Sequence, residues 1–197
     1  ATFIELDVHG KRFVFSGDIG RTNDLLLYPP LKPNKADVLF IESTYGGRFH
    51  PDEVEAIPKI EKLVNDTINR GGSLFIPSFS VERAQLMMLI FWRLLKENKI
   101  PKVPMIMDSP MGANVLELFH STRDWHKLKK HECDEMCSYF TVVSSYRETM
   151  ELRTDEKPKI VIAGSGMLTG GRMLNYLETQ AQNPKNTLLV VGYQAEG

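Results

Sequence analysis

The chain has 197 residues, a formal net charge of −1 at pH 7, 42% hydrophobic residues and 25% charged residues. These values exclude a mainly disordered chain, and the length allows one core or one domain with part of another. The balanced charge excludes a strongly basic field over the whole surface, although a local basic groove is compatible with it. Two cysteines are too few for a disulfide scaffold and predict a reducing, cytoplasmic compartment, and no apolar run has the length of a membrane span.

Short strands are expected in the first 45 residues. Residues 2–8 alternate between apolar and polar side chains, and residues 11–15 follow after His9-Gly10, a pattern typical of a β-hairpin. A proline-stiffened loop separates this hairpin from a third apolar run at residues 37–41. We expect these strands to form a sheet of their own, because they do not share the rhythm of the rest of the chain.

From about residue 50 onwards, strands and helices are predicted to alternate. Helices are indicated at residues 54–68, 80–98, 111–120, 125–137, 145–152 and 172–182, with Ser80 as the cap of the second. Strands are expected at residues 73–76, 103–107, 159–163 and 187–191. This alternation predicts an α/β domain whose mostly parallel sheet is flanked by helices.

An acidic residue stands after each of two predicted strands. Asp18 ends the run Phe-Ser-Gly-Asp at residues 15–18, and Glu42 follows the strand at residues 37–41. A carboxylate in a glycine-flanked turn at a strand end can ligate a metal, and a second acid can hold the ring of a histidine. The alternative is an aspartate that bonds its own turn and a glutamate in an ion pair or a helix cap.

The first strand-to-helix loop has residue types that bind anions. Ser78, Ser80 and Arg83 lie between the strand at residues 73–76 and the long apolar helix. Hydroxyl groups, the amides of a helix start and a guanidinium together suit a phosphate or a carboxylate. The alternative is an ordinary serine cap with a solvated arginine.

A glycine-rich loop at residues 164–172 has Ser165 and Thr169 between a strand and a helix. Its amides can hold a phosphate. A dinucleotide fingerprint starting at Gly164 would need glycine in place of Thr169, and a P-loop would need lysine where Arg172 stands. Both departures are at positions with specific roles, so a dehydrogenase and a P-loop NTPase are excluded.

His126, His131, Cys133 and Cys137 are the one run of the sequence rich in histidine and cysteine. These residue types can hold zinc. Their spacing matches no common zinc pattern and the surrounding segment is charged, so we interpret them as structural residues.

Five segments, taken in order, resemble the successive motifs of β-CASP nucleases, a branch of the metallo-β-lactamase superfamily. They are Phe-Ser-Gly-Asp at residues 15–18, Ile-Glu-Ser-Thr-Tyr-Gly at residues 41–46, and the segments at residues 77–85, 107–111 and 164–172. The resemblance implies that residues 1–45 are strands of a metallo-β-lactamase αββα sandwich. It implies that residues 46–197 are the β-CASP domain.

The resemblance also implies roles for single residues. Asp18 corresponds to the carboxylate that bridges two zinc ions, and Glu42 to the acid that orients a histidine near the leaving group. Five further residues belong to segments that face a cleft for nucleic acid: Ser78, Ser80, Arg83, Ser165 and Thr169. The implied activity is zinc-dependent hydrolysis of phosphodiester bonds in single-stranded RNA, with DNA as the other candidate substrate. The resemblance leaves open whether the protein is a homodimer.

The histidine motifs of the family have no counterpart here. None of the five histidines (His9, His50, His120, His126 and His131) stands in a matching motif. We therefore expect the chain to be an internal piece of a nuclease that is inactive alone and stably binds no zinc. The alternatives are a non-catalytic module that binds nucleic acid or another subunit, and a metallo-hydrolase that acts on a small molecule.

Overall fold

The computed structural model describes residues 2–47 and 53–194. Two separate sheets organise them, one of three strands and one of five. We call them the small sheet, made of β1 to β3, and the large sheet, made of β4 to β8. The α/β class and the mostly parallel sheet predicted from the sequence are confirmed. Among the described residues, no helix combines the length and the apolar character needed to cross a membrane.

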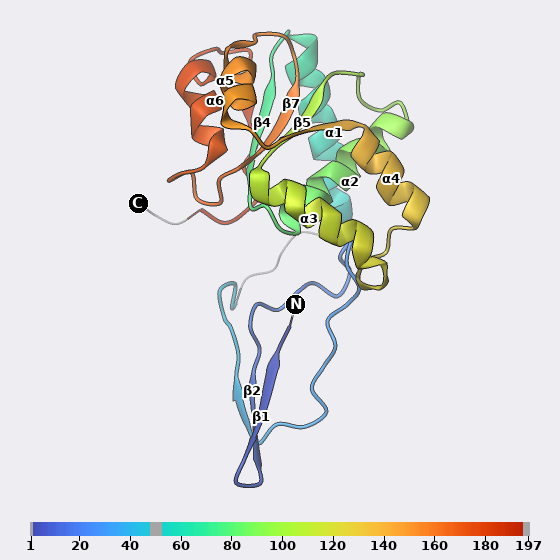
Figure 1. The fold of residues 1–197 in the computed structure, drawn as a ribbon, viewed down its shortest axis with the longest axis vertical. Coiled ribbons are helices and arrows are strands. Elements are labelled where there is room, and N and C mark those ends of the chain that lie inside the picture. Colours follow the sequence, from blue (N-terminus) through green and yellow to red (C-terminus); the bar gives the residue numbers. More distant parts are fainter. Residues whose placement is uncertain (1, 48–52, 195–197) are drawn as a thin grey trace.

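The small sheet consists of β1 (Ile4–Val8), β2 (Lys11–Phe15) and β3 (Val38–Phe40). β1 and β2 form the predicted antiparallel hairpin, and β3 lies parallel to β2. Both turn residues are left-handed, with φ of 49° at His9 and 76° at Gly10, which is the conformation that two-residue hairpin turns require. The hairpin projects away from the large sheet (Figure 1).

The large sheet is parallel throughout, and its strand order is β6-β5-β7-β4-β8. Its strands are β4 (Leu74–Ser78), β5 (Met105–Asp108), β6 (Phe140–Val143), β7 (Ile160–Gly164) and β8 (Thr187–Leu188). The central strands are buried on both faces, which explains why they read as continuous apolar runs and not as alternating ones.

Helices cover both faces of the large sheet. They are α1 (Glu53–Asn69), α2 (Arg83–Lys96), α3 (Pro110–Ser121), α4 (Lys130–Ser138), α5 (Tyr146–Thr154) and α6 (Arg172–Gln180). Helices α1 to α4 pack on one face with Leu74 and Ile76, and α5 and α6 pack on the other with Phe75 (Figure 1). Successive side chains of β4 therefore enter different cores.

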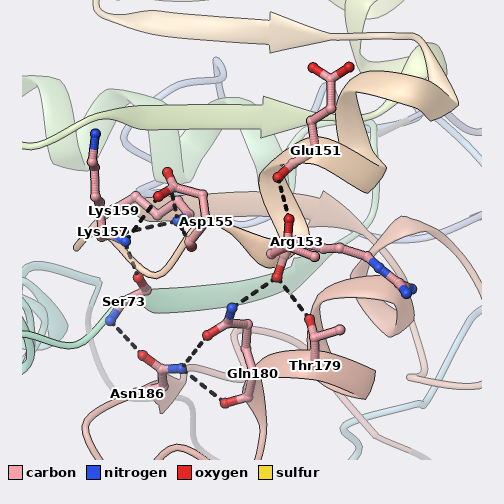
Figure 2. A network of polar contacts seen from close by, with 10 residues as sticks. Ser73, Glu151, Arg153, Asp155, Lys157, Lys159, Thr179, Gln180 and Asn186 are labelled. Carbon is pink, nitrogen blue, oxygen red and sulfur yellow. Dashed lines mark hydrogen bonds and ion pairs between the residues drawn. The ribbon is translucent and has the colours of Figure 1, made fainter.

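A polar network closes the end of the large sheet where β4 and β7 begin (Figure 2). The side-chain oxygen of Asn186 accepts from Ser73 N at 2.8 Å, and its Nδ2 donates to Gln180 O at 2.9 Å. Gln180 Nε2 in turn donates to Arg153 O at 2.8 Å. The buried ammonium of Lys159 donates to Lys157 O at 3.0 Å, so its burial is compensated by hydrogen bonds.

Three expectations about local structure differ from the fold. Ser80 does not cap α2, because its hydroxyl bonds the hydroxyl of Ser109 at 2.8 Å and Glu82 occupies the cap position. The helix expected at residues 125–137 is a short 3-10 turn, Arg123–Trp125, followed by α4. Strand β6 was not predicted, because four residues directly after a helix give a weak periodic signal. The boundary at residue 45 stays a prediction.

Candidate functional site

Asp18 lies in a tight loop directly after β2. Ser16 N donates to Phe40 O at 2.9 Å, and Ser16 Oγ accepts from Glu42 N at 3.0 Å, so the loop is tied to the end of β3. Gly17 has a φ of 53° and lies so close to Thr2 that an added Cβ would be 2.7 Å from Thr2 O. The chain therefore holds Asp18 by its neighbours while its side chain stays exposed.

Glu42 supports this loop from the end of β3. Its Oε1 accepts from Ile19 N, the residue after Asp18, at 2.8 Å. This hydrogen bond, followed by that from Thr44, holds the pKa of Glu42 below its usual range. The structure thus brings the two predicted acids together, and Glu42 acts on the backbone next to Asp18. The predicted contact of Glu42 with a histidine is not tested by the described residues.

Asp18 lines a cavity of about 450 Å³ whose other walls come from residues 2–30 and from Glu82. Asp24 is a second acid there, but its Oδ1 already accepts from Leu26 N at 2.7 Å and Leu27 N at 2.6 Å. No histidine or cysteine of the described chain lines this cavity. Asp18 alone does not supply the several N or O ligands that a zinc pair needs, so these residues do not fit that metal centre by themselves.

Three of the other predicted residues are at the edge of the large sheet where its strands end: Ser78, Ser80 and Ser165. Ser165 N donates to Ser78 O at 3.1 Å, which joins the ends of β7 and β4. Both side chains are buried, and Ser165 Oγ has no hydrogen-bond partner among the described residues. Ser80 is joined to Ser109, the cap of α3, through their hydroxyls. The structure therefore gathers three of the predicted serines at one edge.

Thr169 and Arg83 lie apart from these serines. Thr169 is exposed in the loop before α6. Arg83 lines a mostly apolar groove of about 330 Å³ between α1, α2 and the segment directly after β8, together with Lys59 and Arg21. Arg21 also lines the cavity of Asp18, so the two hollows are neighbours.

The edge of the large sheet is where this topology predicts a binding site. α2 follows β4 on one face, and α6 follows the adjacent β7 on the other. The chain therefore leaves the sheet in opposite directions at neighbouring strands, and open parallel sheets bind ligands in the crevice at such a point.

The Beta-Casp domain model matches residues 84–197 of this chain. The chain belongs to the Beta-Casp family. The match covers the β-CASP core from α2 onward, including the glycine-rich loop, while Asp18 and Glu42 precede it. The resemblance that the five motifs indicated is confirmed.

Curated relatives of this β-CASP chain extend the similarity to its first residues. It is 32% identical to Ribonuclease TTHA0252 of Thermus thermophilus over 100% of its own length and 47% of that protein. It is 31% identical to Transcription termination factor FttA of Methanosarcina mazei, covering 93% of the chain and 30% of the relative. It is 30% identical to Endoribonuclease ysh1 of Schizosaccharomyces pombe, covering 98% and 26%. The chain thus spans less than half the length of these relatives.

Both β-CASP loops at the sheet edge contain a non-glycine residue in the left-handed region. The φ angle is 65° at Glu82, before α2, and 55° at Leu168, before α6. Such conformations cost about 1–3 kcal/mol and are retained where the surrounding structure enforces them, commonly at functional loops.

Phe79 and Ser109 are candidate site residues that the sequence motifs did not single out. Phe79 is 53% exposed between Ser78 and Ser80, and an added Cβ on Gly166 would lie 2.2 Å from its ring. The ring thus stands directly over the glycine-rich loop. The signal for Ser109 was available, since a serine followed by proline is a typical start of a helix.

A buried acid at the end of β5 holds α6, the helix that follows the glycine-rich loop. Tyr176 of α6 donates its hydroxyl to Asp108 Oδ2 at 2.7 Å, which ties α6 to the end of β5. Burial raises the pKa of Asp108, and burial together with the neighbouring carboxylate raises the pKa of Tyr176. Asp108 Oδ1 has no hydrogen-bond partner among the described residues.

We predict that Asp108→Asn stabilises the chain by on the order of 1 kcal/mol at pH 8, because the amide still accepts from Tyr176 and no charge is buried. The raised pKa of Asp108 contributes stability that is present below about pH 3.8 and lost as the pH rises through the folded-state value. The gap between variant and wild type should therefore widen from pH 4 to pH 8. Urea unfolding followed by circular dichroism at several pH values measures it.

Asp155→Asn is the matched control for this prediction. The backbone hydrogen bond from Lys157 lowers the pKa of Asp155, and Lys159 adds to this effect. Its stabilising contribution is present at neutral pH and lost on acidification, so this variant should be less stable than the wild type at pH 8. Equal pH dependence in both variants would contradict the assignment of Asp108.

The four histidines and cysteines of the charged segment, which we interpreted as structural residues, do not all come together in the fold. His126 is buried, and its Nε2 contacts Phe119 O at 2.9 Å while its Nδ1 accepts from Leu128 N at 3.2 Å. His131 is exposed on α4. The side chain that approaches Cys133 and Cys137 is His120, from α3. His50 lies outside the described residues.

Proposed function

We propose that a longer protein containing this chain is a zinc-dependent ribonuclease that hydrolyses phosphodiester bonds in single-stranded RNA. The observation that carries the proposal is the exposed carboxylate of Asp18, which a hydrogen-bonded loop holds in a cavity lined by residues 2–30 and Glu82. The names of the curated relatives, which include a ribonuclease and an endoribonuclease, support an RNA substrate. We further propose a cytoplasmic location, because a chain with two cysteines suits a reducing compartment.

Asp18 and Glu42 have different roles in the proposed enzyme. Asp18 is one acidic ligand of the zinc centre, and Glu42 keeps the backbone after Asp18 in place. Because Asp18 is a single ligand, we propose that the chain alone does not cut RNA and holds no stable zinc pair at this cavity.

The edge of the large sheet is proposed to hold the RNA strand. Ser80 and Thr169 offer hydroxyls, the loops that hold the buried Ser78 and Ser165 offer amides, and Arg83 offers a guanidinium from the neighbouring groove. Such contacts to phosphates position a strand without reading its sequence. The exposed ring of Phe79 is suited to stack on a base, and such stacking is typical of single-strand binding sites. This arrangement favours a polymeric substrate over a small molecule.

The test is cleavage of labelled single-stranded RNA in the presence of zinc. It compares this chain with a longer form that carries the flanking sequence at both ends, and adds single-stranded DNA of the same sequence as a competitor. We expect that the longer form alone cuts the RNA and that a chelator stops it. Single-stranded DNA should compete less well than unlabelled RNA of the same sequence. Binding by the longer form without cutting would instead support a non-catalytic RNA-binding module, and size-exclusion chromatography with light scattering tests whether a homodimer forms.

A further inference from the structure

Three soft metal ligands meet where α3 packs against α4. His120 is in the last turn of α3, and Cys133 and Cys137 are one turn apart on α4. One ligand atom from each residue lies within 4.8 Å of the other two. Within residues 2–47 and 53–194 this is the one group of three or more such residues, and it does not include Asp18.

The burial of these side chains suits a bound ion. Cys133 is 2% exposed, Cys137 is partly buried, and the His120 side chain is 37% exposed. The two sulfur atoms lie within 4.8 Å of each other, on the same face of α4. One side of the cluster is closed by protein, and the histidine side is open for an ion to enter.

The donor set and its dimensions favour zinc. Two thiolates and an imidazole are ligands that Zn²⁺ prefers, with Zn–S of about 2.3 Å and Zn–N of about 2.0–2.1 Å. A tetrahedral ion then separates its ligand atoms by roughly 3.5–3.8 Å, so small side-chain rotations suffice from the present separations.

An acid stands beside the histidine. Asp134 Oδ1 lies 3.1 Å from His120 Nδ1. A carboxylate on one ring nitrogen is the common partner of a metal-bound histidine, because it fixes the orientation of the ring and raises its basicity. Asp134 is thus a positioning residue for His120.

We propose that His120, Cys133 and Cys137 bind one Zn²⁺ ion at the α3–α4 contact, separate from the cavity of Asp18. On binding, two Zn–S bonds and one Zn–N bond form, and the two thiol protons pass to solvent. This inference is independent of the proposed ribonuclease activity, because it concerns residues that do not line the cavity or the sheet edge.

The proposed ion would stabilise the contact between the α3–α4 connection and residues 24–27. The connection between α3 and α4 is hydrogen-bonded to the segment that follows the Asp18 loop. Lys127 N donates to Leu26 O at 2.8 Å, and Lys127 Nζ donates to Asp24 O at 2.5 Å. Leu27 and His126 pair as an isolated β-bridge. Asp24 and Leu27 line the Asp18 cavity. An ion that fixes both ends of the α3–α4 connection therefore also fixes one wall of that cavity.

Cobalt titration of this chain, in reducing buffer and without RNA, tests the site. Thiolate ligation of Co²⁺ gives strong near-ultraviolet absorption, which ligation by carboxylates alone does not give. We expect saturation at one ion per chain, displacement by zinc, and a higher Tm when zinc is added. Asp18→Ala should bind cobalt as the wild type does, which separates this site from the cavity.

Variants decide which residues hold the ion. Loss of an outer-shell partner commonly weakens metal binding about 10–100-fold, so His120→Ala and Cys137→Ser should each weaken it by at least about 100-fold. His131→Ala is the matched control, because it removes an exposed histidine from α4 outside the cluster. His120 is partly exposed, so its variant should fold, and circular dichroism without metal checks this. Absence of thiolate absorption in the wild type, or equal weakening by His131→Ala and His120→Ala, would overturn the proposal.

Discussion

Asp18→Ala, introduced into the longer form that carries both flanks, is expected to lower the rate of RNA cleavage by at least about 100-fold. The Asp18 carboxylate makes no hydrogen bond among the described residues, whereas Asp24 in the same cavity is occupied by two backbone amides. Of the two acids on the small-sheet side of the cavity, Asp18 is therefore the one available to ligate zinc. The measurement is single-turnover cleavage of labelled RNA at saturating zinc, with RNA affinity determined separately by fluorescence anisotropy.

Glu82→Ala is the matched control for Asp18. Glu82 is an exposed acid that lines the same cavity from the large sheet, and its side chain forms no cap for α2. We expect cleavage within about threefold of the wild type, because Glu82 is not a proposed ligand and removal of an exposed side chain changes little. Unchanged cleavage by Asp18→Ala, or equal losses in both variants, would remove Asp18 from its proposed role.

Much of the fold could be predicted because the local signals agree with the final packing. The turn at His9-Gly10 gives the hairpin, and the continuous apolar runs give the buried parallel strands. Strand β6 could not be found this way, since it is a short strand that pairs only with β5 and follows α4 directly. Whether such a short segment forms a strand depends on its pairing partner, which lies far away in the sequence.

The candidate site could be predicted where an acidic residue directly follows a predicted strand, as at Asp18 and Glu42. It was not predictable where side chains from distant elements meet. Ser80 reads as a helix cap, and only the packing of α3 against the end of β4 shows its partner, Ser109. His120 was likewise invisible beside Cys133 and Cys137, because sequence spacing does not report which face of α3 meets α4.

The second large effect is expected for Gly171→Ala, which should destabilise the chain by about 2–5 kcal/mol. Gly171 has a φ of 91°, a conformation in which side chains are strained. An added Cβ would lie 2.1 Å from Gly164 O, and this backbone oxygen cannot move without disturbing the end of β7. The glycine thus closes the loop that holds Ser165 and Thr169. Urea unfolding of this chain, followed by circular dichroism, measures the loss.

Gly170→Ala is the control that separates the steric contact at Gly171 from the mere loss of a glycine in this loop. A Cβ on Gly170 meets no atom within 4 Å, so the change in stability should stay within about 0.5 kcal/mol. In the longer form, Gly171→Ala should also weaken RNA binding, whereas Gly170→Ala should not, because only the former displaces the amides between β7 and α6. Similar stability and RNA affinity of the two variants would mean that the close approach of Gly171 to Gly164 does not shape the loop.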